Sequence, residues 1–419
     1  MKSTVTISPK TSTTQSTPPS PPPPSAQQTP AAPTSTSLRL LHLLIAAAES
    51  LTGSLQSSDL TEVILARLKE LLSCGCSSSI DRLAAHFTDA LHSLLHGSGN
   101  AASPPKFSFE YLEAFQLMQD MSPYIKFGHF TANQAILEAV AGERRVHIID
   151  FDITVGVQWA SLMQALVSVS NGWHPPHLKI TAVARNRKSV QETGRRLAAY
   201  AASIGLPFSF AQCRLDEDDQ FRPTGVKVVR GEVVVFNCIL QPGSTAGGLS
   251  FSPVLRRRGS AAGGLSFIAG AAAMGARVVT IVEEEGEAVG FEGRFVEEMV
   301  RYSAICDAME AGFGGQERAR EAVERVFLGP RIAGAVGRAY RGTERWEKIG
   351  EMMEAAEFGR VGLSFFNICQ ARLLLSLFNG YQLEEEGCNK IVLCWKTCRL
   401  ISASVWSAPP LVSPEGSLL

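Results

Sequence analysis

Residues 146 to 159 read VHIIDFDITVGVQW, and this stretch decides the class of fold. It begins with a short, mostly apolar run, Val146 to Asp150, which is typical of a buried strand. After a loop, Gln158 and Trp159 open a run of apolar residues at helical spacing. A strand, a loop and a helix in this order form the first half of a βα unit. The stretch therefore predicts the first parallel strand of an α/β core.

The rest of the chain repeats this pattern and then changes. Helical spacing follows the first two strands, near Gln158 to Val169 and Ser189 to Ile204. Further candidate strands are Leu178 to Ala184, Phe208 to Arg214, Val233 to Leu240 and Arg277 to Val282. At the C-terminal end, very short connections join the β-type runs YQLEEEG, KIVLCWK and RLISASVW, as in hairpins. We therefore expect a Rossmann-like, methyltransferase-like α/β fold: a mostly parallel sheet, covered on both faces, that ends in an antiparallel hairpin.

The chain before this core divides into a tail and a helical region. Residues 1–37 are almost entirely Ser, Thr, Pro, Ala and Gln, a composition that cannot bury enough apolar surface to order, so we expect a disordered tail. Residues 38–115 are leucine-rich at helical spacing and predict an N-terminal helical cap. Residues 116–408 are expected to form the Rossmann-like core, and residues 409–419 a C-terminal tail.

One more helix is predicted just before the first strand. Thr131 and Gln134 have the spacing of a capping box ahead of the apolar Ile136, and Gly142 is a typical helix terminator. We therefore expect this helix to begin at about Thr131.

Three segments of the helical region have the form L-x-x-L-L. On a helix the leucines of such a segment share one face, so they can dock into a groove on a partner protein. The same pattern also forms ordinary helix cores, which is the commoner case. The sequence leaves both interpretations open for Leu40, Leu43 and Leu44, for Leu68, Leu71 and Leu72, and for Leu91, Leu94 and Leu95.

Composition and charge narrow the class of protein. No apolar run reaches the roughly 18 to 20 residues that span a bilayer, and the N-terminus has no apolar stretch behind a basic start. We expect a soluble protein that is not secreted and has no membrane contact. Nine cysteines include one close pair, Cys74 and Cys76, whose spacing does not suit a zinc knuckle, so we expect reduced thiols and no metal. The net charge is −1, so nothing global draws the chain to DNA.

The loop after Asp150 is where a Rossmann-like fold would hold a cofactor. Such loops use several glycines to let a phosphate or a similar ligand approach the backbone, and here Gly156 stands alone. The acidic residue that would bind a ribose is also absent, because the second strand runs into arginines. We therefore expect no cofactor. Any pocket at this place would be lined by Asp150, Asp152, Gly156, Gln158, Trp159 and Arg185.

Asp150 and Asp152 have two interpretations. As a catalytic pair they would share a proton or a metal, but side chains two residues apart on a strand start out separated unless the backbone turns sharply between them. In the alternative, Asp150 ends the strand and caps backbone amides of the loop or of the next helix. We favour the second and expect no catalytic residue.

Apart from the triplet Arg256 to Arg258 in the glycine-rich segment, the main group of basic residues lies between residues 185 and 196. Their spacing is typical of the solvated face of one helix and its entry loop, and the alternative is contact with the DNA backbone, which carries no sequence preference. The residues concerned in a backbone contact would be Arg187, Lys188, Arg195 and Arg196.

Several blocks together carry a family resemblance. They are FTANQAILEAVAGE (130–143), VHIIDFDI with GVQW and LMQAL (146–166), ETGRRLAAYAASIGLPFSF (192–210), VVVFNCILQ (233–241), VVTIVEEE, RFVEEMVRYSAICDAMEA (294–311) and LCWKTCRLISASVW (393–406). In this order they resemble the GRAS family of plant transcriptional regulators, the scarecrow-like proteins. The resemblance covers about residues 38–408. It implies a nuclear transcriptional regulator that acts through DNA-binding transcription factors and other nuclear proteins, with homo- or heterodimers of GRAS-type proteins among the possibilities, indirect contact with DNA and no catalytic activity.

The sequence departs from the family pattern at three places. Val155 stands where glutamine is common, and a glycine-rich segment follows Gln241. GPRI at Gly329–Ile332 replaces the usual G-R-E-I, which removes a carboxylate and moves an arginine. Two other functions stay open: a methyltransferase-like enzyme, and a regulator that binds a small ligand in the cleft between cap and sheet.

Overall fold

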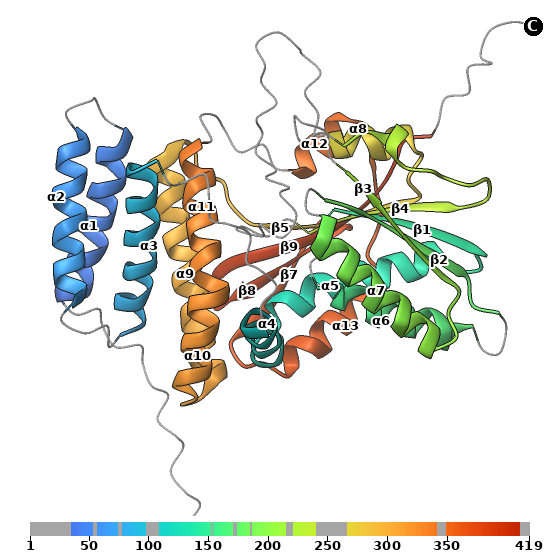
Figure 1. Ribbon diagram of the computed structural model, residues 1–419, viewed down its shortest axis with the longest axis horizontal. Helices are drawn as coiled ribbons and strands as arrows, with labels where there is room; N and C mark the ends of the chain where they lie inside the picture. The colour runs from blue at the N-terminus through green and yellow to red at the C-terminus, as the bar shows by residue number, and fades with distance from the viewer. Residues whose placement is uncertain are drawn as a thin grey trace, which may run out of the picture.

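The residues that the computed structural model describes are 35–52, 57–73, 78–97, 109–151, 153, 155–170, 174–184, 187–214, 221–239, 266–341 and 349–410. They form two bodies side by side: a group of helices, and a sheet with helices on both faces (Figure 1). The predicted disordered tail, except its last residues, and most of the predicted C-terminal tail lie outside the described residues.

Within the described residues the sheet has nine strands, in the order β3-β2-β1-β4-β5-β9-β8-β7, with β6 beside β9. The first five strands pair in parallel, and β9, β8 and β7 add to them in antiparallel. Both features confirm the fold predicted from the sequence. The strands are β1 (Arg145–Asp150), β2 (His177–Val183), β3 (Phe208–Cys213), β4 (Val233–Ile239), β5 (Val278–Glu284), β6 (Gly359–Arg360), β7 (Tyr381–Glu386), β8 (Lys390–Trp395) and β9 (Cys398–Ser407).

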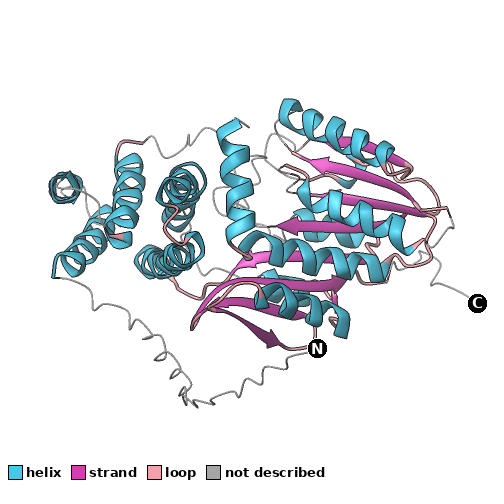
Figure 2. Ribbon diagram, turned by 90° about the horizontal axis from the view of Figure 1, so that it is seen from below, coloured by secondary structure: helices cyan, strands magenta, loops and turns pink. Residues whose placement is uncertain are grey.

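Helices cover both faces of the sheet, because successive side chains of a strand point to opposite sides. Ile148 and Ile149 are both fully buried but belong to different apolar cores. One core lies under α5 (Tyr124–Ala139), α6 (Val157–Val169) and α7 (Arg187–Ser203), on the side where α13 (Phe365–Ser376) also lies (Figures 1 and 2). The other lies under α8 (Ser266–Ala273) and α12 (Ile349–Ala355).

The helical body draws on two distant parts of the chain. Its N-terminal part is α1 (Ser35–Thr52), α2 (Ser57–Ser73) and α3 (Ser79–Leu95), and its second part is α9 (Gly290–Phe313), α10 (Glu317–Val323) and α11 (Gly329–Arg341). Helix α3 packs on α9 and α11, and the ring of Phe87 lies edge-on to that of Phe295 at 5.4 Å. Residues 290–341, which the sequence analysis placed in the core, therefore pack with the cap.

A buried ion-pair network joins the two parts. Arg82 of α3 donates to Glu324 at 2.9 Å and to Glu310 at 2.8 Å. Arg320 approaches Glu324 from the other side, at 3.4 Å. Glu324 is 4% exposed, so its charge needs both arginines. The network ties the start of the chain to its C-terminal half.

The GPRI departure lies beside this network. Residues Glu324–Leu328 form a π-helical turn in which the amide of Gly329 donates to the carbonyl of Glu324. Pro330 has no amide hydrogen to continue the α-helical pattern, which accounts for the widened turn. Arg331 is buried with its guanidinium over the ring of Phe327, 3.9 Å from the ring centre. The arginine of this motif thus packs inside the helical body.

The helix before β1 begins earlier than predicted. Helix α5 starts at Tyr124 and is preceded by Pro123, whereas Thr131 lies inside it and donates its hydroxyl to the carbonyl of Phe127. The capping-box interpretation of Thr131 and Gln134 is therefore wrong. A threonine inside a helix can satisfy its hydroxyl on the preceding turn, so the spacing alone does not mark a helix start.

Two substitutions on α2 test whether a residue is part of the packed core or of the exposed surface. Leu68 is fully buried and Val63 is 66% exposed. We expect Leu68→Asp to unfold the helical body, with a loss of more than about 3 kcal/mol, because it buries an unpaired carboxylate. Val63→Asp should change stability by less than about 0.5 kcal/mol. Urea unfolding followed by circular dichroism measures both. A folded Leu68→Asp protein that has lost only an association would instead make LKELL a contact surface.

Candidate functional site

The C-terminal end of β1 is held by a buried hydrogen-bond network. Asp150 is 0% exposed and accepts from the indole of Trp159 at 2.7 Å and from the amide of Asn237 at 3.1 Å. Because Trp159 opens α6 and Asn237 lies on β4, the carboxylate fixes the helix to two adjacent strands. Both of these partners are side chains, which the predicted capping of backbone amides did not include.

The network continues across the sheet. Gln158 and Asn237 exchange hydrogen bonds at 3.1 and 3.2 Å, and Thr280 of β5 donates to the Asn237 carbonyl at 2.8 Å. Asn133 of α5 donates to the backbone carbonyl of Gln158 at 2.9 Å. Asp150, Gln158 and Trp159, which the sequence marked as candidates, come together in this network. Asn237 was not predicted, because an amide in the middle of a strand carries no local signal of its distant partners.

Gly156 is required by its backbone and by its neighbour. Its φ of +80° is in the left-handed region, and a Cβ built there would lie 2.8 Å from the methyl carbon of Thr193 on α7. The close approach is therefore to a helix of the same chain. Phe151 and Ile153 are also buried, and Phe151 contacts Phe221 and Phe267 with ring centres 5.1 and 5.3 Å apart. Protein side chains pack around the place where this fold class holds a cofactor.

The other predicted pocket and DNA-contact residues divide into two groups. Asp152 and Arg185 lie outside the described residues, and for Arg187 and Lys188 only the backbone, at the start of α7, is described. Arg195 and Arg196 are exposed on α7, where Arg195 pairs with Glu192 at 2.6 Å and Arg196 donates to Thr193 at 3.2 Å. These two guanidiniums are already engaged on their own helix.

The leucines of the L-x-x-L-L segments lie in or against the core of the helical body. Leu40, Leu44, Leu68 and Leu91 are at most 1% exposed. The remaining members are partly buried and pack against the same core: Leu43, Leu71, Leu72, Leu94 and Leu95. This burial favours the core interpretation for all three segments.

A second buried cluster has the connectivity of a catalytic triad. His147 on β1 lies 2.7 Å from the hydroxyl of Thr181 and 3.0 Å from the carboxylate of Glu232. Burial, reinforced by the nearby Lys179, lowers the pKa of His147 to about 4. Thr181 is 2% exposed, so its hydroxyl is closed to a substrate. The neutral ring instead links β1, β2 and the start of β4.

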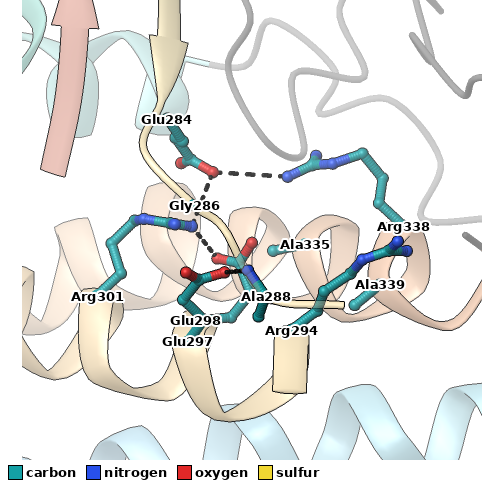
Figure 3. A pocket seen from close by; sticks show the side chains of 10 residues that line it. All are labelled: Glu284, Gly286, Ala288, Arg294, Glu297, Glu298, Arg301, Ala335, Arg338 and Ala339. Carbon is teal, nitrogen blue, oxygen red and sulfur yellow. Dashed lines mark hydrogen bonds and ion pairs between the residues drawn. The ribbon is translucent and has the colours of Figure 1, made fainter. Parts of the chain in front are cut away.

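A small hollow of about 30 Å³ opens where the loop after β5 meets α9 and α11 (Figure 3). At its wall Glu284, whose side chain is 9% exposed, accepts from the Tyr124 hydroxyl at 3.2 Å. Arg301 and Arg338 approach the same carboxylate at 3.4 and 3.6 Å. Burial, together with the like charge of Glu298, raises the pKa of Glu284 to about 7 despite these arginines. The sequence analysis did not select this site.

The described part of the chain contains no candidate membrane-spanning helix, metal site or disulfide. No helix there is long and apolar enough to cross a membrane. In the same residues no group of His, Cys, Asp or Glu side chains has the geometry of a metal site, and the described cysteines are free thiols. Cys74 and Cys76 lie outside these residues.

Comparison with known proteins assigns the chain to a family. The profile of the GRAS domain family matches residues 40–407. The chain belongs to the GRAS domain family. Among its relatives, Protein NODULATION SIGNALING PATHWAY 2 of Medicago truncatula is 52% identical over 403 residues, which cover 89% of this chain and 77% of that protein. Scarecrow-like protein 26 of Arabidopsis thaliana is 45% identical over 397 residues, covering 90% and 80%.

A solved GRAS structure agrees with the fold. The crystal structure of SCL7 from Oryza sativa superposes with a TM-score of 0.65 at 26% identity, covering 88% of this chain and 99% of that one. The family resemblance predicted from the sequence is therefore confirmed. The GRAS relatives are plant transcriptional regulators, so this class of function extends to the chain.

Two glycines test whether Gly156 is held by packing or by backbone geometry alone. Gly142 has a φ of +78° with nothing within 4 Å of a built Cβ, whereas Gly156 meets Thr193. We expect Gly142→Ala to cost about 1 kcal/mol from left-handed strain alone. Gly156→Ala should cost about 2 to 4 kcal/mol, because the β-branched, buried Thr193 cannot yield. Equal losses in urea unfolding would mean that α7 moves away and that the loop is not packed against it.

Proposed function

We propose that this GRAS protein is a nuclear transcriptional regulator that reaches DNA through partner proteins. The observation that carries the proposal is the family match over residues 40–407, because it spans both bodies of the fold. The net charge of −1 and the engaged arginines of α7 support indirect contact, since phosphate binding needs a surplus of Lys and Arg. The names of two relatives at 52% identity refer to a nodulation signalling pathway, and we propose a signalling role of that kind here.

The competing function is a methyltransferase-like enzyme, and the packing at β1 counts against it. A cofactor at that edge would need room beside the backbone of the first loop. There Gly156 faces Thr193, and the Asp150 carboxylate is engaged by Trp159 and Asn237. The family is generally non-enzymatic, which agrees with this geometry.

Ligand-dependent melting of the full chain tests the enzyme alternative. We expect no shift with S-adenosylmethionine, NAD or NADP, because protein side chains pack around the edge that would bind them. A ligand present at about 100 times its dissociation constant stabilises a fold by roughly 2.7 kcal/mol, which shifts the melting temperature visibly. Adenosine serves as the control for nonspecific effects. A rise with S-adenosylmethionine but not with adenosine would restore the enzyme interpretation.

The contact with DNA can be tested directly. Near 150 mM salt, the purified protein should show no sequence preference in a mobility-shift assay, because exposed arginines on one helix read only the phosphate backbone. Chromatin immunoprecipitation from plant nuclei should recover discrete sites whose sequence belongs to a partner factor. A salt-resistant complex of the isolated protein with one DNA sequence would contradict the proposal, and Arg195→Gln with Arg196→Gln would then be the first variants to compare.

A further inference from the structure

Acidic and basic side chains both line the hollow between the loop after β5, α9 and α11. Most of these charges are already paired with groups of the same chain. Arg301 pairs with Glu298 at 2.6 Å and also donates to the backbone carbonyl of Glu285. Glu297 accepts from the amides of Glu287 and Ala288 at 2.7 and 3.1 Å. These contacts fix the 285–289 loop against α9. They leave little of either side chain for a ligand.

Arg338 differs from these residues. Its only ion pair among the described residues is with Glu284, and the 3.6 Å separation is too long for a hydrogen bond. Figure 3 shows its guanidinium pointing across the hollow toward Glu284, with Arg294 lining the same wall. The side chain is 18% exposed, so solvent reaches a guanidinium that has donors to spare. Such a group is suited to bind a carboxylate.

Three exposed residues, two valines and a tyrosine, adjoin lining residues in the sequence. Val289 follows Ala288 of the lining and is 65% exposed, and Tyr340 follows Ala339 and is 40% exposed. Val300, beside Arg301 on α9, is 55% exposed. The ring of Tyr340 packs edge-on to Phe291 at 5.3 Å, which ties this group to the start of α9. Tyrosine and arginine are enriched at protein-binding surfaces.

We propose that this hollow is the docking site for an acidic segment of a partner protein: Arg338 binds an Asp or Glu carboxylate, and the valines and Tyr340 contact its apolar neighbours. The inference rests on the proposed function, because it names the chemistry of a partner through which the regulator acts. The hollow has room for about two water-sized groups, which suits the end of one acidic side chain and is too small for a nucleotide.

Glu284 makes docking depend on pH. It faces Tyr124 from α5, Arg301 and Glu298 from α9, and Arg331 and Arg338 from α11, and its pKa is raised to about 7. A carboxylate bound at Arg338 adds a negative charge beside Glu284 and raises this pKa further. Binding then takes up a proton. The affinity should therefore fall as the pH rises through about 7 and above.

A peptide array tests the site with the full-length chain. The probes are immobilised peptides in which Asp or Glu alternates with Leu, Val or Phe, each beside a copy with Asn or Gln in place of the acids. We expect selective capture of acidic members, and a loss of affinity of roughly tenfold to a hundredfold in Arg338→Gln. Arg372→Gln is the matched control, because this exposed arginine pairs with Glu385 on β7, away from the hollow. Equal capture of the neutral copies, or unchanged binding by Arg338→Gln, would overturn the proposal.

Further measurements keep the outcome clear. If Arg338→Gln melts at a lower temperature, the double variant Glu284→Gln with Arg338→Gln restores the charge balance, and it should be folded and fail to bind. Glu284→Gln alone should bind acidic peptides without the pH dependence. Inorganic phosphate at 10 mM distinguishes a general anion site, since displacement of every peptide by phosphate would overturn recognition of a protein segment. Chromatin immunoprecipitation of the same variant separates the two proposals: discrete sites without acidic-peptide binding would leave the proposed function intact and reject this site.

Discussion

The buried carboxylate of Asp150 is the constraint on which the centre of the structure depends. A fully desolvated charge at the end of a strand is tolerated only when several donors surround it. Trp159 and Asn237 supply them, and each comes from a different element. The loop from Phe151 to Gly156 therefore has to bring the first turn of α6 back over β1 and β4. The left-handed Gly156 and its contact with Thr193 then set where α7 lies against that turn.

The same constraint shapes the edge of the sheet where this class of fold holds cofactors. In such folds the carboxyl ends of the parallel strands form the binding edge. Here the polar side chains of that edge form hydrogen bonds with each other: the side chain of Asn237 is hydrogen-bonded to Asp150, Gln158 and Thr280 within one buried network. The apolar side chains also pack against each other, since Phe151 contacts Phe221 and Phe267. A substitution that freed these groups for a ligand would leave several buried polar groups unpaired.

The sequence predicted what depends on local pattern and missed what depends on distant contacts. The strands, their parallel pairing and the closing hairpin followed from apolar runs and from the lengths between them. So did the grouping of Asp150, Gln158 and Trp159, which are neighbours in the chain. The placement of α9 to α11 in the helical body did not, since an apolar stripe predicts a buried face but not the surface that buries it. The contact of Arg82 with Glu324 spans most of the chain, and no spacing rule reaches that far.

The position of Glu284 gives the two bodies a common boundary. It is the last residue of β5, a central strand of the sheet, and the arginines around it belong to α9 and α11 of the helical body. Tyr124, which also contacts it, opens α5 on the face of the sheet. A change of charge at this carboxylate therefore alters electrostatic interactions in both bodies, because each supplies part of its surroundings. A group at such a boundary couples binding on one body to the packing of the other. The coupling requires that the positive charges around the carboxylate differ between the bound and the free state. The hollow beside Glu284 meets that condition, since a partner's carboxylate at Arg338 would compete directly with the ion pair that Glu284 now makes.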